Sequence, residues 1–194
     1  MANNADVDYI IICHDKAVIN ELAEVLERGC KESPSNAYNT YKAIELLGID
    51  TEPLSLRMDI QSVSKDPEAS EISFQSICAW GHQRDFDKAL KDKYGDKVEV
   101  YFEEYEPGCG VFSTNDMSGK VFKQNYVVDC DCEEEFHLNE QEVAEYYKEV
   151  LGEFPDGVEV THEMLMKRAE AYNEANKDDD CKFIYIHRLS REED

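Results

Sequence analysis

The chain has few basic residues for its size. Its 194 residues include 20 lysines and arginines against 44 aspartates and glutamates, which gives a formal net charge of −24. Nucleic acids are polyanions and many membrane surfaces carry negative charge, so a strongly acidic protein is repelled by both. We therefore expect no direct nucleic-acid ligand and no membrane surface as partner. A basic protein or a metal cation is the electrostatically favoured alternative.

Long apolar runs are also missing. The longest, Tyr9–Cys13, is far shorter than the roughly 20 residues that a membrane-spanning helix needs. The first residues, MANNADVD, lack the basic segment that opens a secretory signal. The seven cysteines are odd in number and scattered, as expected for reduced thiols in a reducing compartment. Together these features predict a cytoplasmic protein.

The usual catalytic and phosphate-binding motifs are absent as well. The nine glycines stand singly, and none forms a GxGxxG or GxxxxGK loop. His162-Glu163 lacks the second histidine of a metalloprotease helix, and Cys109 lies between two turn glycines with no histidine base nearby in the sequence. The sequence therefore favours a protein that is not an enzyme and that needs no cofactor.

The first half of the chain predicts a strand followed by a helix. Residues Val7–Cys13 are apolar on both faces, as in a central strand. Asp15 is placed to cap a helix with an apolar stripe, and Gly29 is placed to end it. The further elements expected here are a short helix over 38–47, a short strand over 54–60 and a polar loop over 62–70.

The middle of the chain predicts a strand, a helix and a three-strand meander. Residues 72–80 resemble a strand, and residues 84–94 have helical spacing with Gly95 as a stop. The strand over 97–103 alternates apolar and polar residues. Glu106–Cys109 has Pro and Gly where a type II turn requires them, so a hairpin to residues 110–114 is expected. A further strand is expected over 120–129.

This order of elements suggests a ferredoxin-like α+β fold, with a mainly antiparallel sheet and helices on one face. Trp80-Gly81, the helix to Tyr94 and the acidic-aromatic run Val100–Gly108 resemble the YubB-like family of ferredoxin-like proteins. The resemblance covers residues 72–128. It implies the same fold and a setting on bacterial plasmids, phages and other mobile elements, and it implies no catalytic residues.

The last third of the chain predicts a helical extension. Asn139 and Glu142 form a capping box, Gly152 is placed to end that helix, and Thr161 is placed to cap another. Residues 181–189 form an apolar strand that belongs inside or beside the main sheet. We therefore expect a core over residues 1–137 and a helix-helix-strand extension over 138–194 packed on it.

The segment Asp129–His137, DCDCEEEFH, is the strongest candidate for a metal site. In an extended chain Cys130 and Cys132 share a face, and with His137 they allow a tetrahedral zinc site to be drawn. The spacing differs from the usual C-x₂-C, and the adjacent acids raise the cysteine pKa and disfavour thiolate. An acidic strand end with ordinary thiols is the favoured interpretation.

The carboxylates give the main functional hypothesis, a non-enzymatic interaction or regulatory protein of a mobile element that binds a basic partner as a nucleic-acid mimic. One alternative is a structural domain that forms a homodimer through an open sheet edge. Another is a metal protein or enzyme that uses Cys130, Cys132 and His137. The candidate interaction surface comprises Glu103, Glu104, Glu106, Asp129, Asp131, Glu133, Glu134 and Glu135.

Overall fold

A computed structural model describes residues 4–33, 38–66, 70–131, 133–179 and 181–192. The chain divides into two compact units, residues 1–117 with 192–194 and residues 118–191. The division falls after Met117, whereas the sequence placed it after His137. The reason is strand pairing, because the strand around Tyr126 pairs on one side with the strand around His137 and on the other with the strand around Ile186.

The first unit contains an antiparallel sheet in which β1 is central. The strand order is β2-β3-β1-β4-β5, and Tyr9 of β1 pairs with Phe74 and Phe102 on either side. The predicted central strand and the 106–109 hairpin are confirmed, but the turn is not of type II, because Gly108 lacks the positive φ of that type and Gly110 has it instead. Strand β2 occupies part of the region expected to be loop, and residues 67–69 lie outside the described residues. The strands are β1 (Asn4–Cys13), β2 (Met58–Asp66), β3 (Glu71–Ala79), β4 (Val98–Glu106) and β5 (Val111–Thr114).

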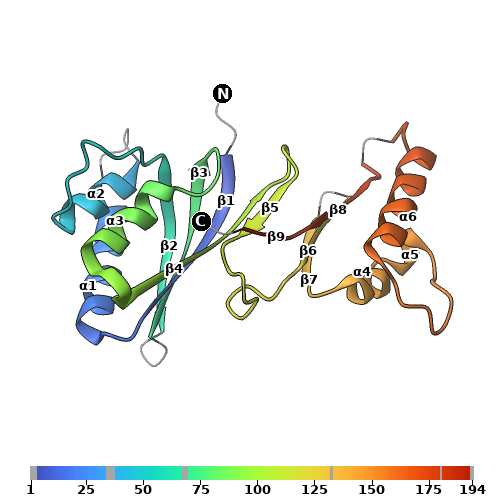
Figure 1. The fold of residues 1–194 in the computed structure, drawn as a ribbon. Coiled ribbons are helices and arrows are strands. Elements are labelled where there is room, and N and C mark those ends of the chain that lie inside the picture. The colour runs from blue at the N-terminus through green and yellow to red at the C-terminus, as the bar shows by residue number, and fades with distance from the viewer. Residues whose placement is uncertain (1–3, 34–37, 67–69, 132, 180, 193–194) are drawn as a thin grey trace. The chain divides into compact units, whose positions relative to one another are not determined.

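Three helices of the first unit, α1 (Lys16–Glu32), α2 (Asn39–Leu46) and α3 (Arg84–Tyr94), cover one face of this sheet (Figure 1). Asp15 caps α1 as predicted, since its Oδ1 accepts hydrogen bonds from the backbone N–H of Ala17 and Val18, at 3.0 and 3.4 Å. Gly95 ends α3, also as predicted, and opens a short 3₁₀ turn to Lys97.

Gly29 has a different role from the one its sequence position suggested. Helix α1 continues past it to Glu32. A Cβ at position 29 would lie 2.7 Å from Cβ of Ala43 in α2, closer than real side-chain carbons approach. The glycine therefore permits α1 and α2 to pack closely. Its role is to make room for Ala43 of α2, and it does not end the helix.

The core of the first unit is built around Tyr9, whose side chain is fully buried. Its ring stacks on Phe74 with centroids 4.9 Å apart and meets Phe86 edge-on at 5.6 Å. Its hydroxyl oxygen accepts a hydrogen bond from the backbone N–H of Gln83, at 3.0 Å. The aromatic cluster joins the central strand to β3 and to α3, and it fixes the start of that helix through Gln83.

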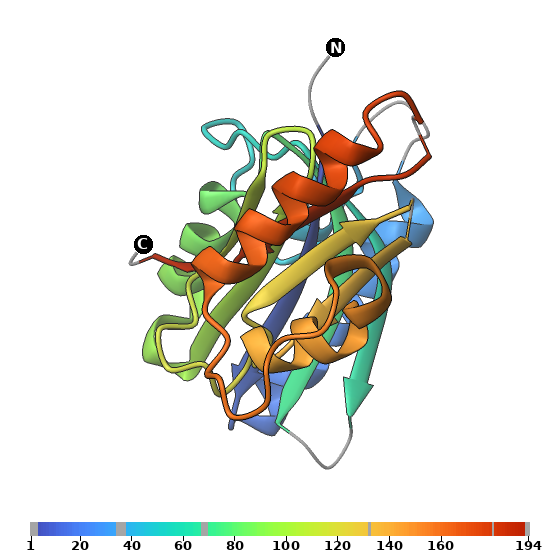
Figure 2. The ribbon, with the colours of Figure 1, turned by 90° about the vertical axis from the view of Figure 1, so that its right-hand side faces the viewer.

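The second unit contains a three-stranded antiparallel sheet of order β7-β6-β8. The apolar strand expected beside the main sheet is β8, and it pairs with β6 in this second sheet instead. The helices of the unit lie on one face of the sheet (Figure 2). The elements are β6 (Tyr126–Cys130), β7 (Glu133–His137), α4 (Glu140–Tyr146), α5 (Lys148–Leu151), α6 (His162–Ala175), β8 (Ile184–Arg188) and a two-residue β9 (Ser190–Arg191).

The helix start at Asn139 follows the predicted capping box. The Oδ1 of Asn139 accepts a hydrogen bond from the backbone N–H of Glu142, and the Glu142 carboxylate accepts one from the backbone N–H of Leu138. The helical region expected to run to Gly152 is split into α4 and α5 at Tyr147. Among the described helices, none combines the length and apolar character needed to cross a membrane.

Candidate functional site

The carboxylates predicted on β4 are less exposed than a solvated strand edge would make them. Glu103 and Glu104 are each 8% exposed, and Glu106 is half-buried. The reason is that β4 lies between β1 and β5, and of these two pairings the sequence indicates only the hairpin with β5. These residues therefore do not form a freely exposed acidic surface.

Glu104 has defined partners. Its Oε2 accepts a hydrogen bond from the backbone N–H of His82 at 2.7 Å, and its Oε1 accepts one from the Ser113 hydroxyl at 2.7 Å. Burial alone would raise the pKa of Glu104, but the hydrogen bonds from His82 and Ser113 outweigh it and hold the pKa below its usual range. The carboxylate is therefore ionised at neutral pH although it is buried.

The acidic residues of the second sheet are distributed over two faces. Glu133, Glu134 and Glu135 of β7 are exposed, as is Asp131, while Asp129 is half-buried. Because strand residues alternate, Glu133 and Glu135 lie on one face, and Glu134 lies on the other with its pairing partner Asp129. In its sheet β7 is an edge strand, where charged side chains disfavour pairing with another chain.

The structure does not bring Cys130 and His137 together. In the β6–β7 ladder Cys130 pairs with Glu133 and Tyr126 pairs with His137, so the two residues lie at opposite ends of the hairpin, roughly 13 Å apart at the usual strand rise. They do not share one metal ion. Cys132 lies outside the described residues. Among the residues that the structure describes, no group of three or more His, Cys, Asp or Glu side chains is placed to hold a metal.

The cysteines differ sharply in environment, and this predicts their reactivity. Burial raises the pKa of Cys78 to about 12, while burial and the neighbouring Asp131 raise that of Cys130 to about 11. Cys109 and Cys181 are exposed. Since the thiolate is the nucleophile, iodoacetamide at pH 8 should alkylate Cys109 and Cys181 at least about 100-fold faster than Cys78.

Peptide mass spectrometry over a time course measures these rates. In denaturant all the thiols should react at similar rates, which controls for differences in peptide detection. Equal rates for Cys78 and Cys109 in the folded protein would contradict the placement of Cys78.

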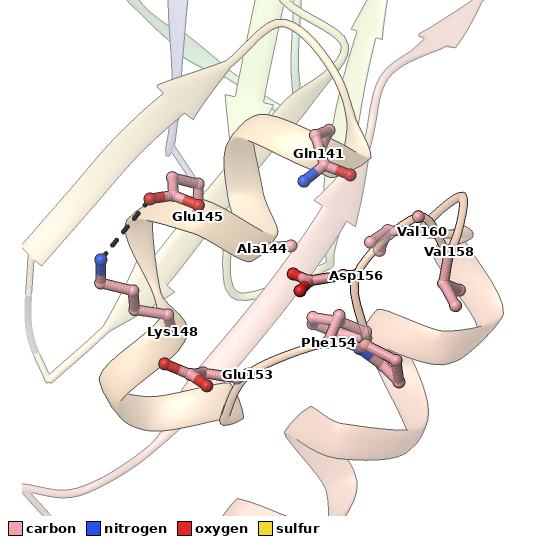
Figure 3. Close-up of a pocket in the computed structure, with 11 residues that line it drawn as sticks. Gln141, Ala144, Glu145, Lys148, Glu153, Phe154, Asp156, Val158 and Val160 are labelled. Carbon is pink, nitrogen blue, oxygen red and sulfur yellow. Dashed lines mark hydrogen bonds and ion pairs between the residues drawn. The ribbon is translucent and has the colours of Figure 1, made fainter.

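The second unit has a hollow of about 500 Å³ between α4, α5 and the loop that precedes α6 (Figure 3). Ala144, Phe154 and Val160 contribute apolar surface to it. Asp156 extends from the loop toward α4 (Figure 3). The lining residues are Gln141, Ala144, Glu145, Lys148, Glu153, Phe154, Pro155, Asp156, Gly157, Val158 and Val160.

Arg168 of α6 contacts the loop that carries most of this lining. Its guanidinium lies over the Phe154 ring, 3.8 Å from the centroid. Its Nη1 donates to the carbonyls of Leu151 and Gly152, each at 2.7 Å, and its Nη2 donates to the carbonyl of Glu153 at 3.0 Å. These carbonyls are at or just beyond the end of α5, where backbone acceptors lack helical partners. One side chain thus satisfies the helix end and positions the loop.

The charge around the hollow is negative. Glu145, Glu153 and Asp156 supply three carboxylates, Lys148 supplies one ammonium, which lies 3.5 Å from Glu145 in an exposed ion pair, and the Arg168 guanidinium adds a second positive charge behind Phe154. Exposed pairs of this kind are weak, so Glu145 stays accessible to a stronger cationic partner. Carboxylates beside apolar side chains such as Phe154 and Val160 suit a cationic side chain with an apolar stem. No sequence motif indicates this site, because its lining comes from α4, α5 and the loop that follows them.

Comparisons with protein-family models, with curated proteins and with solved structures gave no significant match to the chain.

Proposed function

We propose that this protein is non-enzymatic and that it binds a basic protein partner through the acidic hollow of its second unit. The lining in Figure 3 carries the proposal, because the carboxylates of Glu145, Glu153 and Asp156 line one hollow together with Phe154 and Val160. A lysine or arginine side chain of a partner would bury its methylene groups on that surface and place its charge among the carboxylates.

The charge of the whole chain supports the same function. A net charge of −24 attracts a basic protein at long range and increases the rate of encounter at low salt. Basic patches that can recognise such a surface are commonly those that bind nucleic acid. We therefore propose that the partner is a nucleic-acid-binding protein and that this chain competes with its nucleic acid in the bacterial cytoplasm.

The first unit supports a ferredoxin-like fold. Its strand order β2-β3-β1-β4, with helices between β1 and β2 and between β3 and β4, has two β-α-β halves whose first strands are central. With the resemblance of residues 72–128 to YubB-like proteins, this favours a role on a bacterial mobile element.

The test is a pull-down from bacterial lysate with the tagged full chain. The bound material is washed at rising salt, and the proteins released at each step are identified. The hollow variant carries Glu145→Gln, Glu153→Gln and Asp156→Asn. The control variant carries Glu52→Gln, Asp92→Asn and Asp96→Asn, which make the same charge change at exposed sites of the first unit.

The wild type and the control variant should retain a basic nucleic-acid-binding protein that high salt or added duplex DNA releases, and the hollow variant should lose it. Equal retention by all three proteins would assign the binding to charge alone. Retention of no basic protein would contradict the proposed function.

A further inference from the structure

A second pocket, of about 150 Å³, lies in the first unit beside the only tryptophan of the chain. Trp80 follows β3 and is 66% exposed. Its backbone is in the left-handed region, with φ of 71°, and Gly81 follows with φ of 102°. Large residues rarely adopt that conformation, and it persists only where the surroundings impose it. The pocket is lined by Ala5, Trp80, Gly81, Glu104, Glu106, Cys109 and Val111.

Gly81 explains how a buried carboxylate reaches this pocket. A Cβ at position 81 would lie 2.6 Å from Oε2 of Glu104, so only glycine leaves room for the carboxylate beside the turn. The hydrogen bonds from His82 and Ser113 then fix its orientation. The His82 ring stacks on Phe102 with centroids 3.6 Å apart, and this contact holds in place the residue whose backbone N–H donates to Glu104. The negative charge at this wall of the pocket is therefore built into the fold.

Glu106 contributes an acceptor that lacks a donor. Its Oε2 is buried and has no hydrogen-bond partner among the described residues. A buried carboxylate oxygen without a partner is costly, and a bound donor would remove that cost. The pocket thus joins one fixed carboxylate, one unsatisfied carboxylate oxygen and the exposed indole of Trp80.

We propose that this pocket binds the primary ammonium group of a lysine side chain. Its N–H groups would donate to Glu104 and Glu106, and its methylene stem would lie against Trp80 and Val111. The indole face adds attraction for a cation. The inference rests on the proposed function only in that the basic partner would supply the lysine.

The geometry favours an ammonium over a guanidinium. Arginine recognises a carboxylate with two parallel hydrogen bonds to its two oxygens. In Glu104 one oxygen already accepts from His82 and the other from Ser113, which hinders that arrangement. An ammonium is a compact donor of three hydrogen bonds that can reach single oxygens of two separate carboxylates.

The fluorescence of Trp80 provides a direct test, because no other tryptophan contributes. The probe is Nα-acetyl-lysine methylamide, titrated into the full chain at low salt. The matched probes are its Nε-acetylated form, which has the same stem without the charge, and Nα-acetyl-arginine methylamide. We expect a saturable change with the lysine probe, none with the acetylated form, and binding at least about threefold weaker with the arginine probe.

Glu106→Gln tests the site within the protein, because it keeps the side-chain shape and removes the charge. It should lower the affinity for the lysine probe about tenfold or more, because a charge-assisted hydrogen bond is lost. The exposed Glu52→Gln should change binding less than twofold. Equal responses to the lysine and acetylated probes, or equal affinities of the Glu106→Gln and wild-type proteins, would overturn the proposal. If Glu106→Gln does not fold, the comparison of probes on the wild type decides alone.

The test of the lysine pocket can fail or succeed independently of the test of the proposed function. The hollow variant, with Glu145, Glu153 and Asp156 neutralised in the second unit, should bind the lysine probe as the wild type does. Probe binding without a captured partner would support the pocket and contradict the proposed function. A captured partner without probe binding would do the reverse.

Discussion

Replacing Tyr9 with alanine is expected to lower the free energy of unfolding of the first unit by about 3–5 kcal/mol. The side chain is fully buried, and its removal leaves a cavity among Phe74, Phe86 and Phe102. It also removes the hydroxyl that accepts the backbone hydrogen bond of Gln83. Urea denaturation followed by Trp80 fluorescence measures the loss, because the only tryptophan lies in this unit.

Two further variants separate packing from hydrogen bonding. Tyr9→Phe keeps the ring and leaves the Gln83 N–H without its acceptor, which should cost about 1–2 kcal/mol. Ile77→Ala is the control, because Ile77 lies on β3 with its side chain 38% exposed and should cost less than about 1.5 kcal/mol. A loss for Tyr9→Ala no larger than that for Ile77→Ala would contradict the central place of Tyr9 in the core.

Replacing Arg168 with alanine is expected to destabilise the second unit by about 1–3 kcal/mol. The variant loses three hydrogen bonds to carbonyls of residues 151–153 and the contact with the Phe154 ring. We set the range low because two of these hydrogen bonds are solvent-exposed. The stability of Arg168→Lys should lie between those of Arg168→Ala and the wild type, because a lysine ammonium cannot donate to all the carbonyls that the planar guanidinium reaches.

Hydrogen exchange of the amides of residues 152–154 and 156–158, together with thermal unfolding, measures this effect. Lys167→Ala is the matched control, because Lys167 is the preceding residue of α6 and is exposed. It should change stability by less than about 0.5 kcal/mol. Because the loop carries Glu153 and Asp156, Arg168→Ala should also weaken partner capture without altering any acidic residue. Unchanged exchange in the loop would show that Arg168 does not position it.

Local patterns in the sequence predicted elements well where one residue determines the geometry. Asp15 and Asn139 cap helices because their side chains reach the nearby backbone N–H groups, and this requires no distant contact. The turn at residues 106–109 follows in the same way from Pro107 and Gly108. Such features depend on three or four consecutive residues, which a reader of the sequence sees directly.

Partners that are distant in sequence could not be predicted. The strand near Ile186 was recognised, but an apolar pattern does not specify which sheet it joins, and it pairs with β6 in the second unit. Glu104 was placed at the surface because its burial depends on β4 having neighbours on both sides. The contact between Arg168 and Leu151 spans 17 residues and involves a backbone carbonyl, so no side-chain pattern indicates it.

The close approach of α1 and α2 at Gly29 and Ala43 implies a coupled pair in the evolution of this chain. Since a single added methyl at position 29 meets the methyl of Ala43 at 2.7 Å, the two positions share one fixed volume. A methyl group at position 29 is better tolerated when Ala43 loses its own, as in Gly29→Ala with Ala43→Gly, and the closest contact then becomes the 3.1 Å approach to the backbone N and Cα of residue 43. Among diverged sequences that keep this helix pair, the two positions should therefore covary as small residues while the surrounding helix surfaces drift freely.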